Sequence, residues 1–390
     1  MANECARVSL FIVFPFRTFV EVIFFLEVKK RQVLQKSETT ERYNNRNWTI
    51  CYTLRALFKF ILIKNTTMSK KPSQLKSRLH PRNKNIERYD LDALVKAIPS
   101  LKKFVTPNKY GDDSVAFSNP EAVKSLNKAL LHYYYGIEHW DFPDENLTPP
   151  IPGRADYLHH LADVLREHNF GKIPTGAMIT CFDIGTGASC IYPILGVTEY
   201  DWNFIASDID PKSIASAEKI VAANPSLKGK VELKLQENPR DILFGIIPRE
   251  SKIDLAMCNP PFHASVEDAE KGSIRKIQNL TGKEIEKATL NFAGKYSEMV
   301  TYGGEYKFIH NLIRESKTYA ENCYWFSTLV SKQSNVKGIQ KALRTADATE
   351  IKTIPMGTGN KSSRIIAWTF LSKEDQKEWK LQRWKSKSDQ

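Results

Sequence analysis

The sequence has no pair of cysteines at Cys-x-x-Cys spacing and no histidines spaced as in a zinc finger. Its six cysteines are scattered along 390 residues, so neither a structural zinc site nor a disulfide framework is expected. Internal repeats and low-complexity segments are also missing. We therefore expect buried free thiols in a reducing compartment, the cytoplasm, and no metal in the functional site.

The sequence also lacks a long uninterrupted hydrophobic run. Residues 8–28 are apolar, but Pro15, Arg17 and Glu21 interrupt them, and charges at mid-bilayer depth are costly. This stretch has no small-residue cleavage site of the kind that ends a signal peptide. A second apolar stretch, residues 57–63, is too short to span a bilayer. We expect no stable membrane association.

Acidic residues are too few to balance the basic ones. The chain has 57 Lys and Arg against 44 Asp and Glu, a formal net charge of +13. A basic surface attracts polyanions, so nucleic acid is the first partner to consider, although a basic protein without such a partner would have the same composition. A basic arm follows Met68, and we expect Arg78, Arg82 and Lys84 in it to contact phosphates.

The composition of the chain changes at Met68. Residues 1–67 show no clean periodicity and no turn chemistry, and we interpret them as an extension outside the fold, with a wrongly chosen start codon as one explanation. The basic arm and a helical region are expected over residues 68–150. An α/β domain is expected over residues 151–373, followed by a charged tail over residues 374–390.

Strands and helices alternate in the second half of the chain. Short apolar runs predict four strands, at residues 177–184, 203–207, 231–235 and 253–258, and segments with helical spacing separate them. This alternation predicts a mostly parallel sheet with helices on both faces. Ligands of such sheets bind at the carboxyl ends of the strands, where the motifs described next are found.

The first motif, Asp-x-Gly-x-Gly, begins at the end of the first predicted strand with Asp183, continues with Gly185 and Gly187, and is followed by Ser189. Glycines let the backbone approach a ligand closely, but Cys190 stands where a dinucleotide motif has its third glycine. The acidic residue would repel a pyrophosphate, whereas it suits the ammonium group of S-adenosylmethionine. A tight turn with a capping aspartate is the alternative.

A second acidic residue, Asp208, ends the second predicted strand. A carboxylate there can accept hydrogen bonds from both hydroxyls of a ribose. The other role open to it is to cap the helix that begins near Pro211. Asp210 suits that cap better, so we assign Asp208 to the ribose.

The third motif, Asn259-Pro260-Pro261-Phe262, ends the fourth predicted strand. The prolines fix the backbone and withhold amide donors. The Asn259 side-chain oxygen and the Pro260 carbonyl can then accept the hydrogens of an exocyclic amine and align its nitrogen with a sulfonium methyl. Phe262 offers a ring on which a flipped-out base can stack. An Asn-Pro turn with a buried phenylalanine is the alternative.

From about Met68 through at least Phe370 the sequence resembles the bacterial ribosomal RNA large-subunit methyltransferase F family. The matching blocks are Leu79–Asn83, Pro149–Tyr157, Asp183–Pro193 and Cys258–His263. The resemblance implies a Rossmann-like class I S-adenosylmethionine-dependent methyltransferase fold with an N-terminal helical RNA-binding region. It also implies methyl transfer to the N6 amine of one adenine in 23S ribosomal RNA.

The same resemblance implies roles for single residues. The target base is expected on Asn259 through Phe262, and His263 either contacts RNA or packs. A polar segment, residues 272–287, is expected to be a substrate loop or an ordinary solvated connection. RNA phosphates are expected at Lys361 and Arg364. The cofactor pocket is expected to contain Arg154, Gly185, Ser189, Asp208 and Asn259, with Asp241 near the cofactor's adenine.

Other functions are compatible with parts of this pattern. An enzyme of the same fold could methylate adenine in DNA or glutamine in a protein, and the net charge of +13 favours nucleic acid. The choice of RNA over DNA rests on the resemblance alone, and naked 23S RNA and a large-subunit assembly intermediate both fit it. A non-catalytic ribosome-assembly factor would not need the intact methyl-transfer motifs.

Overall fold

The computed structural model of the 390-residue chain describes residues 79–384 except for 109, 262, 264, 266–299 and 359–360. Backbone contacts divide the chain into two units, Met1–Leu75 and Lys76–Gln390. Every described residue belongs to the second unit. The proposed extension, the start of the basic arm and the polar segment at 272–287 lie outside the described residues. Within the described ranges, no helix has the length and apolar character needed to cross a bilayer.

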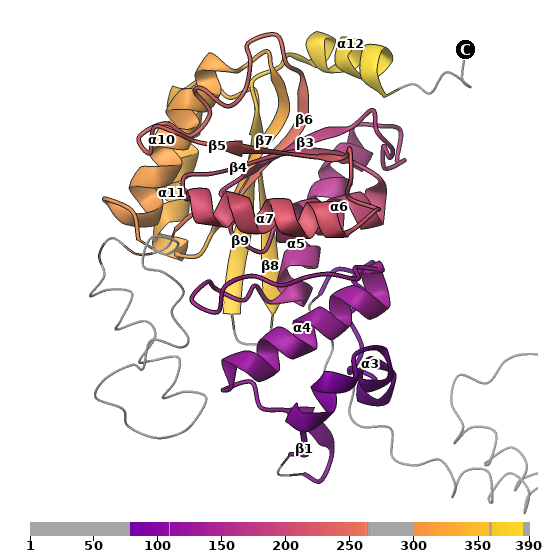
Figure 1. The fold of residues 1–390 in the computed structure, drawn as a ribbon. Coiled ribbons are helices and arrows are strands. Elements are labelled where there is room, and N and C mark those ends of the chain that lie inside the picture. The colour runs from indigo at the N-terminus through magenta and orange to yellow at the C-terminus, as the bar shows by residue number, and fades with distance from the viewer. Residues whose placement is uncertain are drawn as a thin grey trace, which may run out of the picture. The chain divides into compact units, whose positions relative to one another are not determined.

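A seven-stranded sheet is central to the second unit (Figure 1), with the strand order β5-β4-β3-β6-β7-β9-β8. The first five strands in that order are parallel neighbours, whereas β9 runs antiparallel to both β7 and β8. The mostly parallel sheet predicted from the sequence is therefore confirmed. The strands are β3 (Thr180–Ile184), β4 (Asn203–Asp208), β5 (Val231–Leu235), β6 (Ile253–Cys258), β7 (Cys323–Val330), β8 (Glu350–Thr358) and β9 (Lys361–Thr369).

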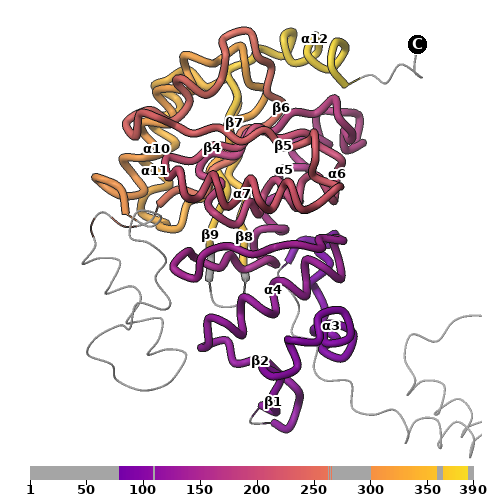
Figure 2. The backbone as a smooth tube through the Cα atoms, in the orientation of Figure 1, coloured from indigo at the N-terminus to yellow at the C-terminus, as the bar shows by residue number. Residues whose placement is uncertain are grey.

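Helices cover both faces of the sheet, because the side chains of each central strand alternate between two cores. In β6, Leu255 and Met257 join the core that α5, α6 and α7 cover, and Ala256 and Cys258 join the core that α10 and α11 cover. Figure 2 shows α10 and α11 grouped on one side of the sheet. The five helices are α5 (Ile151–Glu167), α6 (Ile191–Tyr200), α7 (Pro211–Ala223), α10 (Gly304–Thr318) and α11 (Gln333–Thr345).

A small helical region precedes α5, as the sequence predicted. Its longest helix, α4, begins at Pro120, where Asn119 accepts hydrogen bonds from two backbone amides, and Gly136 in a left-handed conformation ends it. The helix packs on α3, α5 and α6. The elements of this region are α3 (Leu91–Ala97), the short helix η1 (Pro99–Phe104), β1 (Val105–Pro107), β2 (Asp113–Val115) and α4 (Pro120–Tyr135).

The C-terminal end differs from the charged tail expected over residues 374–390. Up to Trp384 it is a helix, α12 (Lys373–Arg383), which Ser372 and Asp375 cap. The indole groups of Trp379 and Trp384 are buried and donate to the same oxygen of Asp254, each at 2.7 Å. These two tryptophans give the charged segment an apolar side, which a count of its charges does not reveal.

Candidate active site

The strand order reverses between β3 and β6, which are adjacent in the middle of the sheet. From β3 the chain proceeds through β4 and β5 toward one edge, and β6 and β7 then extend the sheet on the other side. Asp183 is opposite Met257 and Ile184 is opposite Cys258 in the parallel ladder. The loops that begin at Gly185 and Asn259 therefore leave the sheet side by side, as expected at a switch point.

The glycine loop after β3 is built around backbone hydrogen bonds to β4. Gly185 and Thr186 donate to the Ser207 carbonyl at 3.0 and 2.9 Å. Gly185 and Gly187 have left-handed φ angles of 74° and 66°, and no atom lies within 4 Å of the point where a Cβ on either would stand. Cys190, at φ 52°, immediately precedes α6. The loop thus presents an open backbone surface that a ligand can approach.

Asp183 is a buried carboxylate at the base of this loop. Among the described residues neither of its oxygens, nor the Thr186 hydroxyl, has a hydrogen bond of full geometry. Burial raises the pKa of Asp183 to about 7, and the negative charge of Asp208 adds to the shift. The Thr186 hydroxyl, which lies close enough for a weak interaction, and the charge of Arg154 oppose it. A buried carboxylate that lacks full hydrogen bonds favours a cationic ligand, because the ligand's charge stabilises the ionised form.

Asp208 lies at the tip of β4, between the glycine loop and α7. Its two oxygens accept hydrogen bonds from the Gly187 and Asp210 amides, each at 2.9 Å. Burial raises the pKa of Asp208, and these backbone donors oppose the shift. Each oxygen keeps a second lone pair, which a ribose hydroxyl can use. The prediction that Asp210 caps the next helix is confirmed, because it accepts from the Lys212 amide.

The Asn259 corner follows β6. The Asn259 Oδ1 atom is buried and, among the described residues, has no hydrogen-bond donor. Pro260 is buried and Pro261 is half-buried. A buried carbonyl oxygen without a donor is costly to the protein alone, and an amine would supply the missing hydrogen. Phe262 lies outside the described residues, so its stacking role stays a prediction.

Arg154 and Asp241 were expected near the cofactor. Arg154, in the first turn of α5, donates to the Tyr192 hydroxyl at 3.2 Å and lies over its ring, close enough to influence Asp183 electrostatically. Asp241 lies in the turn after β5 and accepts from Asn238 at 2.7 Å. The structure thus brings Arg154 to the buried carboxylate, and it gives Asp241 a local partner.

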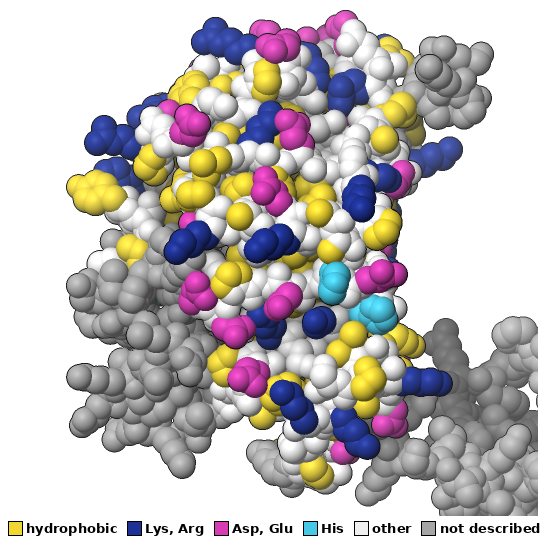
Figure 3. All heavy atoms as spheres, viewed as in Figure 1, with side chains coloured by type: hydrophobic (Ala, Val, Ile, Leu, Met, Phe, Trp, Pro, Cys, Tyr) yellow, Lys and Arg dark blue, Asp and Glu magenta, His cyan; other side chains and the backbone are white. Residues whose placement is uncertain are grey.

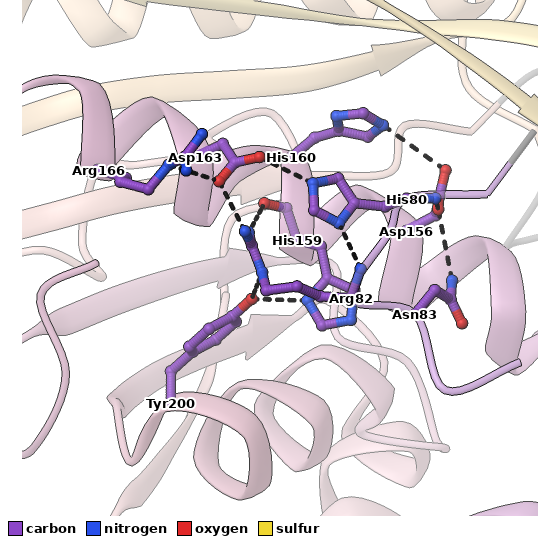
Figure 4. Close-up of polar contacts among 9 residues, drawn as sticks. All are labelled: His80, Arg82, Asn83, Asp156, His159, His160, Asp163, Arg166 and Tyr200. Atoms are coloured by element: carbon purple, nitrogen blue, oxygen red, sulfur yellow. Dashed lines mark hydrogen bonds and ion pairs between the residues drawn. The ribbon is translucent and has the colours of Figure 1, made fainter. Parts of the chain in front are cut away.

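Two residues that were expected to contact phosphates, Arg82 and Lys84, form hydrogen bonds and ion pairs within the protein instead. Arg82 donates to Asp163, to the His159 carbonyl and to the Tyr200 hydroxyl (Figure 4), at 2.8, 2.8 and 3.2 Å. Lys84 forms an ion pair with Glu199 at 3.0 Å and donates a hydrogen bond to the Tyr134 carbonyl. Both cations thus bind the segment after residue 79 to the helices α4, α5 and α6. Their contact with RNA stays a prediction.

Most of the residues drawn in Figure 4 form a hydrogen-bonded group that holds this segment, which we call the N-terminal clasp. The His80 ring hydrogen-bonds to Asp163 at 2.8 Å, and the Asn83 amide group donates to the Pro152 carbonyl at 2.8 Å. Burial lowers the pKa of His159 to about 3, so that ring is neutral at ordinary pH. The clasp consists of His80, Arg82, Asn83, Asp156, His159, Asp163 and Tyr200.

The remaining RNA candidates are described only in part. Arg78 and the side chain of Lys361 lie outside the described residues. Arg364 is half-buried in β9, opposite Val330 and Pro355. His263 forms a single parallel bridge with Val300, which concerns its backbone and leaves its side-chain role a prediction.

Sequence reasoning missed two aromatic residues that support the site. The Trp140 indole, which is buried, donates to the Ser189 carbonyl at 2.9 Å and so anchors the end of the glycine loop. The Tyr157 hydroxyl hydrogen-bonds to the backbone of Cys258, just before the Asn259 corner. An apolar pattern identifies such residues as core, and only the fold reveals their polar ends.

Comparisons with known proteins agree with this geometry. A family model described as RNA methyltransferase matches residues 73–372. The ribosomal RNA large subunit methyltransferase F of Cytophaga hutchinsonii is 52% identical over 310 residues, 80% of this chain and 96% of the relative. Its counterpart in Yersinia enterocolitica is 50% identical over 79% of this chain and 92% of the relative.

Solved structures of a human protein resemble the fold. The catalytic domain of human METTL16 in complex with the MAT2A 3′UTR hairpin 1 is 28% identical, with a TM-score of 0.65, over 76% of this chain and 97% of that one. The N-terminal domain of human METTL16 in complex with SAH is 27% identical, with a TM-score of 0.59, over 75% of this chain and 99% of that one.

Proposed function

The chain belongs to the RNA methyltransferase family, and from this membership we propose that it transfers a methyl group from S-adenosylmethionine to the N6 amine of one adenine in 23S ribosomal RNA. The fold is the Rossmann-like class I methyltransferase fold expected from the sequence. One observation supports the proposal above the others: Asp183 and Asn259, at adjacent strand ends, both hold buried oxygens without partners among the described residues.

The residues around the glycine loop fit S-adenosylmethionine. Asp183 offers a buried carboxylate to the cofactor's ammonium group, and Asp208 has lone pairs left for its ribose hydroxyls. Gly185 and Gly187 leave space for the ligand beside their backbone, and we propose that Arg154 and Ser189 contribute to the same cofactor site. When bound, the cofactor supplies an activated methyl group on a sulfonium. One relative of this fold has been solved with SAH.

The Asn259 corner fits an exocyclic amine. The Asn259 Oδ1 atom and the Pro260 carbonyl accept the two amine hydrogens, which aligns the nitrogen lone pair with the methyl group. Because the methyl donor has its own leaving group, the protein needs alignment and fixed dipoles rather than a strong base. In this proposal the adenine is flipped out of its helix and stacks on Phe262.

RNA is favoured as the substrate by the relatives and by charge. The relatives are named for ribosomal RNA, and a solved neighbour holds an RNA hairpin. The described part of the face in Figure 3 mixes basic and acidic side chains and shows no single basic patch. The net charge of +13 belongs to the whole chain. We propose that Arg78, His263, Lys361 and Arg364 contribute to RNA contact, and that the enzyme acts in the cytoplasm.

Mass-spectrometric mapping of N6-methyladenosine tests the proposal. Purified protein and S-adenosylmethionine are incubated in parallel with unmodified 23S RNA, with large-subunit assembly intermediates, with DNA and with a glutamine-containing protein. The expected result is one methylated adenine in the ribosomal substrate, in naked RNA or in the particle. Methylation of DNA or of protein instead would refute the assignment of RNA as the substrate. No methyl transfer to any of these substrates would refute the assignment of the protein as a methyltransferase.

The substitution Asn259→Ala tests the amine site. It removes one of the two proposed acceptors, so kcat is expected to fall by about 10²-fold or more, while Kd for S-adenosylmethionine changes little because Asp183 and the glycine loop are intact. The matched control is Asn169→Ala, whose side chain caps an exposed turn. Full activity of the Asn259 variant would contradict the proposal that Asn259 Oδ1 accepts a hydrogen bond from the amine.

A further inference from the structure

The hydroxyl of Tyr157 closes a short chain of hydrogen bonds at the end of β6. The side chain, in the second turn of α5, is fully buried. The Cys258 amide donates to its oxygen at 3.4 Å, and the hydroxyl is 2.9 Å from Ser327 Oγ. Ser327 in turn donates to the Ala256 carbonyl at 2.8 Å. The chain of bonds therefore begins and ends on β6.

The strand ladder explains why a side chain is needed at this point. β6 and β7 are paired from Ile253 opposite Cys323 to Ala256 opposite Phe326. β6 stays paired with β3 as far as Cys258. Backbone groups two residues apart point toward the same neighbouring strand, so Ala256 and Cys258 both face β7. From Ala256 onward, the hydroxyl groups of Ser327 and Tyr157 act as hydrogen-bond partners of the β6 backbone. In the preceding part of β6 the backbone of β7 has this role.

We propose that Tyr157 is a positioning residue for methyl transfer: it fixes the end of β6 and thereby the direction of the Asn259 amide oxygen. The inference rests on the proposed function, because it assigns Tyr157 to the same amine site. Cys258 immediately precedes Asn259, so a displacement of its amide is passed directly to the corner. A misplacement of about 1 Å at a reacting group is enough to cost about 10²-fold in rate.

Helix α5 serves both halves of the site. Arg154, one turn before Tyr157, acts on Asp183 beside the cofactor. Asp156, between the two, is buried and accepts from the His80 amide in the N-terminal clasp. The same helical turn thus reaches Asp183 electrostatically and contacts the backbone before the Asn259 corner and the N-terminal segment. In this proposal, fixing that turn holds Asp183 and the Asn259 corner in place relative to each other.

Tyr157→Phe tests the role of the hydroxyl alone, because the ring and its contact with Tyr192 remain. The matched control is Tyr324→Phe. Tyr324 is also fully buried, in β7, and among the described residues its hydroxyl has no hydrogen-bond partner. For both variants kcat, KM for RNA, Kd for S-adenosylmethionine and Tm are measured together with backbone amide hydrogen exchange at Cys258.

The expected result for Tyr157→Phe is a fall of about 10- to 100-fold in kcat, KM and Kd within about twofold, and faster exchange at Cys258. Tyr324→Phe is expected to match the wild type in all of these measurements. An unchanged kcat in Tyr157→Phe overturns the inference. So does a loss that appears in Kd or Tm instead of kcat, because that pattern indicates a merely structural role.

Ser327→Ala breaks the same chain from β7 without touching α5, and it serves if Tyr157→Phe does not fold. Its kcat is expected to fall in the same direction, and the double variant is expected to be no slower than the slower single one. Fully additive losses overturn the single chain of bonds. If the wild-type protein transfers no methyl group, the proposed function fails, while the exchange rate at Cys258 still reports whether Tyr157 holds β6.

Discussion

At the scale of single residues, Asp183 shows how the fold prepares a site at a cost in stability. A carboxyl group has a pKa of about 4 in the unfolded chain, whereas burial raises the pKa of Asp183 to about 7 in the folded one. Between these values the folded protein holds a proton that the unfolded chain has released. Stability due to this group therefore decreases as pH rises from about 4 to about 7.

The same pKa predicts a pH-dependent affinity for the cofactor. Only the ionised form of Asp183 attracts the ammonium group, so Kd for S-adenosylmethionine is expected to decrease as pH rises from about 5.5 to about 7.5. Calorimetric titration of the wild type and of Asp183→Asn measures this, and the variant's profile is expected to be flat over that range. Asp144→Asn, at an exposed position, is the control. A flat wild-type profile would contradict the pairing.

The residues of the site were predictable where chemistry and position coincide. Asp183 and Asn259 each follow an apolar run, so their sequence context indicated a strand end. Tyr157 and Trp140 carried no such signal, because their polar atoms reach partners that are 101 and 49 residues away. The expectation of buried free thiols is confirmed for the cysteines in the described ranges, which are Cys181, Cys190, Cys258 and Cys323.

At the scale of secondary structure, strands were easier to predict than the segments between them. β5 and β6 have the predicted bounds, while β3 begins at Thr180 rather than at Ala177. The start of α5 is not indicated by its prolines, although Pro152 occupies a first turn that needs no amide donor. β7 and the hairpin of β8 and β9 were not predicted, and the hairpin's place in the sheet depends on pairing with β7.

Arg82 permits a test of two different roles for a basic residue. Its three hydrogen bonds in the N-terminal clasp predict that Arg82→Ala lowers the free energy of unfolding by about 2 kcal/mol and leaves the salt dependence of RNA binding unchanged. Arg88→Ala, which removes an exposed ion pair, is the control for stability. An unaltered Tm with a flatter salt dependence would instead support the phosphate contact expected from the sequence.

The contact of α12 with β6 predicts the effect of a truncation. Asp254 is buried, and its carboxylate is held by Trp379, Trp384 and Arg383. Ending the chain at Ser372 leaves that charge with the Thr180 amide as its remaining donor. Urea unfolding is expected to show a loss of about 3–5 kcal/mol. Removing only residues 385–390 is the control, and equal stability of the two truncated proteins would contradict the role of α12.

At the scale of the whole molecule, the family match begins and ends inside the chain. The family model covers residues 73–372, and the curated relatives match about 80% of the chain. These boundaries agree with the resemblance drawn from Met68 onward. The strand order β5-β4-β3-β6-β7-β9-β8 could not be predicted from periodicity, because order in a sheet depends on contacts between distant segments.

A protein that begins at Met68 tests the interpretation of residues 1–67. If they are outside the fold, the shortened protein is expected to keep the Tm of the full chain within about 1 °C and its kcat within about twofold, because a change of 1 kcal/mol corresponds to about 2–8 °C. Differential scanning calorimetry and the methylation assay measure both. Loss of either property on shortening would give the extension a function.

The N-terminal clasp has a consequence for how this enzyme can be modified or can diverge. The expected domain boundary at residue 150 is next to Ile151, where α5 begins, and the clasp joins that helix to residues near 80. The helical region is therefore not an accessory that can be exchanged between relatives while the chemistry stays fixed. If this region contacts the RNA, as the resemblance implies, a change there that adapts the enzyme to another RNA is expected to alter α5 as well. Target choice and turnover would then change together.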